Sequence, residues 1–185
     1  MVLGLALGGC APLRHGALPD PSGAPLQAVH RLRIVIFEMA GPDVPFHTGL
    51  IVQSGAETLI YDPAGMWAPP GQTRGEGEVI RNITPADEEA YLTRQGIRYS
   101  LGGWLVHIFD AAVSPAVARL AMRRAVERPQ SLPLHCAHNV SSLLSGLPGF
   151  SDIQPHRITG ELLEDLLLRD DLTYTRRALD TTQSG

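Results

Sequence analysis

A single cysteine stands at the expected start of a helix in the stretch Ser131 to Phe150, "SLPLHCAHNVSSLLSGLPGF". Pro133 interrupts what precedes it, and the apolar residues after Cys136 recur at helical spacing as far as Gly146. The unpaired N–H groups of a first helical turn stabilise a thiolate and lower the pKa of a cysteine. The position of Cys136 therefore indicates a nucleophile, although its place on the apolar side of the helix also fits a buried core residue.

A nucleophilic thiol needs a base from elsewhere in the fold, because residues adjacent on a helix point in different directions. His47 is the best candidate, since it opens the first strand of an expected hairpin and can project from the sheet edge towards a helix end. Asp62 ends the second strand of that hairpin, where its carboxylate could hold the other imidazole nitrogen. Asn139 lies one turn after Cys136 and could orient a substrate or bind the preceding loop.

The two histidines beside the cysteine suggest a different hypothesis, a metal site. His135, Cys136 and His138 would supply ligands, and His47 could complete the set. Their spacing is tighter than the usual structural zinc patterns, which pair ligands from two separate segments. We therefore predict no metal and no cofactor. His107 lies within an apolar strand and is interpreted as a core histidine.

The elements that would position these residues form an α+β pattern. Period-two alternation and β-branched residues predict strands at 29–39, 49–52, 58–61, 79–83 and 102–113, with a hairpin loop at 53–57. Helices are predicted at 85–95, capped by Thr84, at 115–128, opened by Ser114, at 136–145, and after a cap at Thr159. We expect an antiparallel sheet with the helices segregated in sequence.

The N-terminal segment suggests where in the cell the protein is located. The first ten residues, "MVLGLALGGC", resemble the lipobox of bacterial lipoprotein signal peptides, which implies a signal peptide at 1–9 and lipidation of Cys10. Residues 10–28, rich in Pro, Gly and Ala, would be a tether, and 29–185 a single domain. The implied location is the bacterial cell envelope, on the periplasmic side, with membrane contact through the lipid anchor only.

Two further features of the composition bear on function. The formal net charge is −4 and no cluster of Lys or Arg is present, so nucleic acid is not an expected partner. The chain has two cysteines. If Cys10 carries lipid, Cys136 is a lone thiol in an oxidising compartment, without a partner for an intramolecular disulfide.

The order of these motifs resembles a known family. A histidine hairpin, "FHTGLIVQSGAETLIYDPAG", precedes a cysteine helix, "HCAHNVSSLL", as in the circularly permuted papain-like cysteine hydrolases, the NlpC-type group that includes relatives of lecithin retinol acyltransferase. The resemblance covers the hairpin and one helix. It implies a papain-like fold with nucleophile Cys136, base His47 and a third polar residue on the adjacent strand. Asp62 takes that third place, whereas family members often carry a His or Glu slightly earlier, where Tyr61 stands here.

The function expected from these observations is hydrolysis or acyl transfer at an amide or ester bond, with a peptidoglycan peptide or a lipid as substrate. The alternatives are a lipid-anchored binding or assembly module of the same fold without catalysis, and the metal site at His135, Cys136 and His138.

Overall fold

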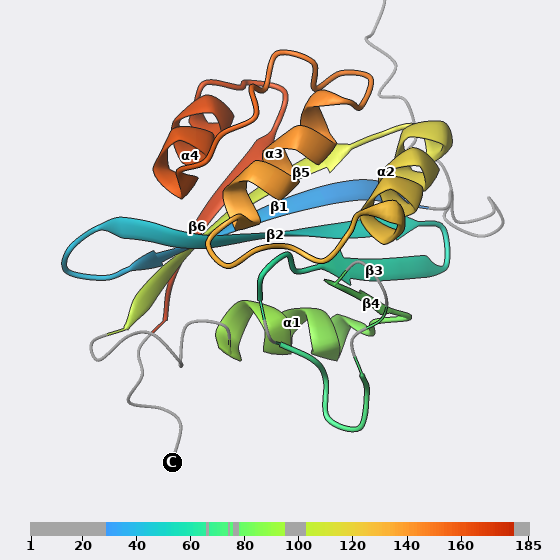
Figure 1. Cartoon of the computed structure of the whole chain (residues 1–185), viewed down its shortest axis with the longest axis horizontal. Helices are drawn as coiled ribbons and strands as arrows, with labels where there is room; N and C mark the ends of the chain where they lie inside the picture. The colour runs from blue at the N-terminus through green and yellow to red at the C-terminus, as the bar shows by residue number, and fades with distance from the viewer. Residues whose placement is uncertain (1–28, 66, 74, 76–77, 95–102, 180–185) are drawn as a thin grey trace, which may run out of the picture.

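A computed structural model describes residues 29–65, 67–73, 75, 78–94 and 103–179. These residues form a six-stranded antiparallel sheet with helices packed on both faces (Figure 1). The strands are β1 (His30–Met39), β2 (Val44–Ser54), β3 (Glu57–Tyr61), β4 (Val79–Arg81), β5 (Trp104–Ala112) and β6 (Thr173–Leu179). The helices are α1 (Pro85–Arg94), α2 (Pro115–Glu127), α3 (Cys136–Ser145) and α4 (Thr159–Leu167). The predicted α+β class with an antiparallel sheet is confirmed. The predicted signal peptide and tether, including Cys10, lie outside the described residues.

The sheet separates two hydrophobic cores. Its strand order is β4-β3-β2-β1-β5-β6, with α1 on one face and α2, α3 and α4 on the other (Figure 1). The side chains of the central strand β1 alternate between the two faces of the sheet, and β1 is buried on both. Leu32, Ile34 and Ile36 belong to the core under α2–α4. Val35 and Phe37 belong to the core that includes residues of α1. The side of the sheet that α1 covers is called the α1 face, and the opposite side is called the α2–α4 face.

Most of the predicted elements lie where the sequence places them. The helix cap at Thr84 is reciprocal, since the Asp87 N–H donates to Thr84 Oγ1 at 3.1 Å and the Thr84 N–H donates to Asp87 Oδ2 at 2.9 Å. Ser114 caps α2 by accepting from the Val117 N–H at 3.3 Å. The β2–β3 hairpin is longer than predicted, and its turn shrinks to Gly55 and Ala56.

Three details of the prediction are wrong. Thr159 does not cap α4: Ile158 is the N-cap residue, and Thr159 is buried in the first turn. Strand β6 is missed, because it borders the sheet and most of its residues are exposed, so its sequence lacks an apolar alternation. The helices are not segregated in sequence either, since α1 lies between β4 and β5, and β6 follows α4.

Candidate active site

His47 and Asp62 meet at the end of the β2–β3 hairpin. The ladder between these strands ends with the pair Leu50 and Tyr61, so Asp62 follows the last paired residue of β3. His47 lies on the part of β2 that extends past this end. Its Nε2 atom is 2.7 Å from Asp62 Oδ1. Asp62 is fully buried and His47 is 8% exposed, so the predicted contact between these two residues is present in a largely water-free place.

A β-bulge shapes the same stretch of β2. The register of the β1–β2 ladder shifts next to His47, so that Phe46 has no Cα partner on β1. Bulges bend a strand and redirect the groups beside them. The Phe46 carbonyl oxygen lies 3.9 Å from Cys136 Sγ, where it accepts the S–H when the thiol is protonated. The irregularity in β2 therefore places a backbone carbonyl against the predicted nucleophile.

Helix α3 begins at Cys136, as predicted, and its first turn reaches β2 beyond the end of β3. The backbone N–H groups of Thr48 and Ala137 and the side chain of His47 lie close enough to the Cys136 sulfur to lower its pKa. His135, at the N-cap position, makes no side-chain cap hydrogen bond. No side chain from that position competes with the sulfur for the N–H groups of the first turn. Cys136 is 4% exposed.

This arrangement allows residues from opposite faces of the sheet to meet. Cys136 belongs to a helix of the α2–α4 face, whereas the His47 ring stacks on Phe37 of the α1 face, with ring centroids 5.8 Å apart. The two side chains reach each other around the edge of β2, where β3 has ended. Because His47 Nε2 is occupied by Asp62, Nδ1 is the nitrogen left for the sulfur.

The electrostatics of the three residues favour an ion pair. Burial acts to lower the pKa of His47, but the Asp62 carboxylate and the Cys136 sulfur outweigh it and raise this pKa from 6.5 to about 10. Burial acts to raise the pKa of Cys136, but the hydrogen bond and positive charge of His47, with the two backbone N–H groups, bring it below its ordinary value. These opposite shifts favour a thiolate beside an imidazolium.

The surroundings of Asp62 are highly constrained. Tyr91 on α1 donates its hydroxyl to Asp62 Oδ1 at 3.0 Å, and the Trp67 N–H donates to Oδ2 at 3.4 Å. A Cβ at Gly65 would lie 2.0 Å from the carboxylate, so only glycine fits there. The sequence analysis missed Tyr91. The signal for its burial is present, because Tyr91 and Leu92 are apolar neighbours in an otherwise polar helix, but nothing in the pattern links it to Asp62.

Asn139 binds the loop that leads into α3, one of the two roles predicted for it. Its Nδ2 donates to Ser131 Oγ at 2.9 Å, and Arg128 donates to its Oδ1 at 3.4 Å. The Ser131 N–H in turn donates to the buried Glu78 carboxylate at 3.3 Å. Glu78, which the sequence did not single out, thus ties this loop to the segment before β4. A contact of Asn139 with substrate stays a prediction.

The histidines beside Cys136 do not form a metal site with it in the described part of the chain. The rings of His135 and His138 lie with centroids 6.2 Å apart, while the cysteine sulfur lies 3.9 Å from the Phe46 carbonyl oxygen of β2. Among the residues that the structure describes, no three His, Cys, Asp or Glu side chains are grouped so that they could hold a metal ion. The metal hypothesis built on His135, Cys136 and His138 therefore has no geometric support.

His107 is a core histidine, as predicted, and both of its ring nitrogens are bonded. Nε2 lies 3.1 Å from Glu38 Oε2, and Nδ1 lies 2.9 Å from the Tyr174 hydroxyl. Burial lowers the pKa of His107, although Glu38 acts to raise it. His107 is 5% exposed and lies between Val106 and Ile108, which face α1, so its side chain is on the α2–α4 face.

Comparisons with protein-family models, curated proteins and solved structures give no match for this chain. None of the described helices combines the length and the apolarity that crossing a membrane requires.

Proposed function

We propose that this protein is a thiol hydrolase or acyltransferase that acts on an amide or ester bond. The observation that carries the proposal is the convergence of three residues from three elements. Cys136 comes from the start of α3, His47 from β2 and Asp62 from the end of β3, with 2.7 Å between His47 Nε2 and Asp62 Oδ1. The opposite pKa shifts of the cysteine and the histidine support it further.

In the proposed reaction, the Cys136 thiolate attacks the carbonyl carbon and forms a C–S bond, while the carbonyl electron pair moves to oxygen. When the C=O bond forms again, the bond to the leaving nitrogen or oxygen breaks, and the His47 imidazolium gives that atom its proton. Water or an acceptor hydroxyl then loses a proton to His47 and attacks the thioester, which releases Cys136. Asp62 holds the imidazole throughout and stabilises its charged form.

The oxyanion of this reaction would be stabilised by backbone N–H groups at the start of α3. The first N–H groups of a helix have no partner within the helix, and the helix dipole places a partial positive charge there. His135 supplies no side-chain cap. Preorganised donors of this kind stabilise the charge that develops in acyl transfer.

The finer features of the proposal come from the resemblance to the permuted NlpC-type hydrolases. The histidine hairpin β2–β3 precedes the cysteine helix α3 in the chain, which is the order of that group. We include a papain-like fold, lipidation at Cys10, a location in the bacterial cell envelope, and a peptidoglycan peptide or a lipid as substrate in the same proposal.

An electrophilic thiol probe tests the proposed function. We expect rapid labelling of Cys136 near neutral pH, its loss in Cys136→Ala and a strong decrease in His47→Ala. His138→Ala is the matched control, because this histidine is nearer in sequence but its ring packs against His135, with centroids 6.2 Å apart. Its labelling should equal that of the wild type. A Cys136 that is inert to the probe in the folded protein would contradict the proposal.

A second candidate is a non-catalytic binding or assembly module of the same fold. Burial favours it, since Cys136 is 4% and His47 8% exposed, and a nucleophile must reach its substrate. The same probe separates the two candidates, because a module that keeps its thiol inaccessible would be labelled only on unfolding.

A further inference from the structure

Tyr91 contacts the carboxylate that holds His47. The side chain is fully buried, and its hydroxyl donates to Asp62 Oδ1 at 3.0 Å. His47 Nε2 lies 2.7 Å from the same oxygen. One carboxylate oxygen therefore lies between the imidazole on β2 and the phenol on α1, so the position of Tyr91 bears on the orientation of the histidine.

The ring of Tyr91 is fixed by close packing. It meets the Phe37 ring edge to face, with centroids 5.6 Å apart, and the Trp67 ring at 5.3 Å. On the remaining side, Gly49 of β2 comes so close that a Cβ there would lie 2.0 Å from the Tyr91 hydroxyl oxygen. This close approach requires glycine two residues after His47.

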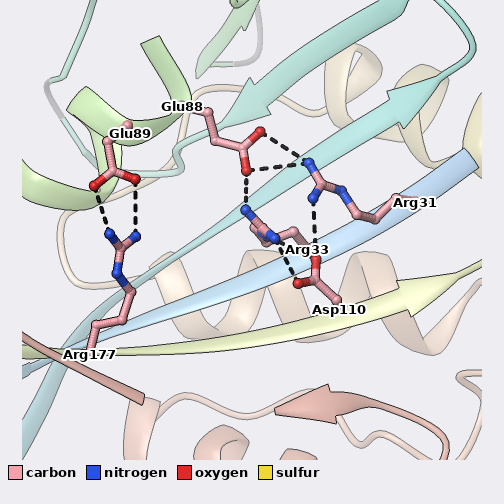
Figure 2. Close-up of polar contacts among 6 residues, drawn as sticks. All are labelled: Arg31, Arg33, Glu88, Glu89, Asp110 and Arg177. Atoms are coloured by element: carbon pink, nitrogen blue, oxygen red, sulfur yellow. Dashed lines mark hydrogen bonds and ion pairs between the residues drawn. The ribbon is translucent and has the colours of Figure 1, made fainter. Parts of the chain in front are cut away.

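Helix α1, which carries Tyr91, is held on the sheet by ion pairs one turn earlier (Figure 2). The Glu88 carboxylate lies between Arg31 and Arg33 of β1, at 3.1 Å from Arg31 and in contact with Arg33. Arg33 also pairs with Asp110 of β5 at 2.7 Å. These groups are largely shielded from solvent, with 15–25% of each side chain exposed.

A second ion pair attaches α1 to the edge of the sheet. Glu89 pairs with Arg177 of β6 at 2.8 Å, through two parallel hydrogen bonds (Figure 2). Helix α1 is thus attached to β1 and β6 directly and to β5 through Arg33. These contacts fix its distance and rotation relative to the strand that carries His47.

We propose that Tyr91 is a positioning residue for the candidate active site, which fixes the Asp62 carboxylate and thereby the ring of His47. The inference rests on the proposed function and deepens it, because it adds to the three residues a fourth that touches neither sulfur nor substrate. Without the hydroxyl, Asp62 loses a hydrogen-bond donor and its carboxylate can rotate. The His47 imidazolium then loses part of the stabilisation that a fixed carboxylate provides, so less thiolate forms at a given pH.

The test measures the rate at which iodoacetamide alkylates Cys136 as a function of pH. This rate follows the thiolate population and needs no substrate. In Tyr91→Phe we expect the rate at mildly acidic pH to fall about threefold to tenfold, the scale set by the net contribution of one ordinary hydrogen bond. The profile should move to higher pH, while the limiting rate at alkaline pH stays the same.

Tyr61→Phe is the matched control, since Tyr61 is equally buried but belongs to the opposite core, with its hydroxyl near Ser131 and Arg128. Its profile should overlay that of the wild type. Gly49→Ala is the second variant, because it displaces the Tyr91 hydroxyl without removing it and should move the profile in the same direction. A change in melting temperature alone would reflect a merely structural role of Tyr91.

The outcomes separate this inference from the proposed function. If His47→Ala moves the profile but Tyr91→Phe and Gly49→Ala do not, the positioning role is wrong and the proposed function stands. If His47→Ala leaves the profile unchanged, His47 does not activate the thiol, and both the inference and the proposed function are wrong. A shift in Tyr91→Phe that Tyr61→Phe does not share supports the inference.

Discussion

Two buried histidines of one sheet pair with carboxylates and yet differ in charge. His47 pairs with Asp62 at 2.7 Å on the α1 face, and His107 pairs with Glu38 at 3.1 Å on the α2–α4 face. The pKa of His47 rises to about 10, whereas that of His107 falls below its ordinary value. A buried histidine with an acid beside it is therefore not by itself a catalytic base.

The difference lies in the other neighbours. His47 contacts an ionisable thiol, which as a thiolate adds a second negative charge beside the ring. His107 contacts the neutral hydroxyl of Tyr174, and its pKa is lowered first by burial and then by the positive charge of Arg176, which also approaches Glu38 at 3.7 Å. The first site favours an imidazolium and the second a neutral imidazole. The comparison shows that the third partner and the local charge decide what a histidine–carboxylate pair can do.

The largest expected effect comes from neutralising the two carboxylates in turn. Asp62→Asn removes the charge that stabilises the His47 imidazolium, and we expect probe labelling of Cys136 near neutral pH to fall about tenfold or more. Glu38→Gln is the matched variant at the other pair, and labelling should stay within about twofold of the wild type, since Glu38 is not among the groups that shift the pKa of Cys136 or of His47. Equal losses in both variants would mean that the two pairs do not differ as described.

The His47–Asp62 and His107–Glu38 pairs should also affect the pH dependence of stability in opposite directions. Because the pKa of His47 is raised in the folded protein, its contribution is fully present below 6.5 and is lost as pH rises through about 10. The lowered pKa of Cys136 acts oppositely, since its contribution is present above the ordinary 9.0 and lost as pH falls through the folded value. The two contributions therefore cancel between the folded pKa of Cys136 and 9.0, and the net alkaline loss from this pair falls between about 9 and about 10.

The pKa of His107 is lowered, so its contribution is present above 6.5 and is lost as pH falls through the folded value. Urea unfolding over a range of pH measures the free energy of unfolding on both the alkaline limb and the acid limb of the stability curve. His47→Ala should flatten the alkaline limb, which lysine does not obscure because the chain contains none. His107→Gln should flatten the acid limb. A variant that flattens the limb assigned to the other histidine would overturn the assignment.

The smallest expected effect concerns the ion pairs of α1. Glu88→Gln weakens contacts with two arginines at a largely shielded position, and we expect a loss of about 1–2 kcal/mol in the free energy of unfolding. Glu89→Gln is the matched change on the exposed pair with Arg177, where about 0.5 kcal/mol or less is expected. Because α1 carries Tyr91, Glu88→Gln should also slow Cys136 alkylation slightly. A larger loss of stability in Glu89→Gln than in Glu88→Gln would contradict the view that the shielded ion pair contributes more.

The sequence predicted the parts of this site that depend on local pattern. The start of α3 at Cys136 follows from Pro133 and the helical spacing after it, and the hairpin places His47 and Asp62 at one end of two paired strands. Helix geometry also favoured His47 over the histidines beside the cysteine, and the predicted contact of His47 with Asp62 is present. All of these inferences use residues within one or two adjacent elements.

The parts that could not be predicted depend on contacts between distant elements. Tyr91 reaches Asp62 only because α1 packs across the hairpin, and Glu78 meets the loop before α3 over 53 positions of sequence. Strand β6 was missed because an edge strand needs little apolar alternation. The bulge at Phe46, which places a carbonyl against the sulfur, depends on the pairing of β1 with β2 and has no signature in either strand alone.

The most direct test of the central claim is the protonation state of His47, measured by NMR of its ring nitrogens during a pH titration. We predict that His47 stays an imidazolium through neutral pH and titrates with a midpoint of about 10. In Cys136→Ala this midpoint should be lower, because the sulfur no longer contributes charge. His107 in the same spectra should be neutral over the same range and unaffected by that change. A neutral His47 ring at neutral pH in the wild-type protein would contradict the account.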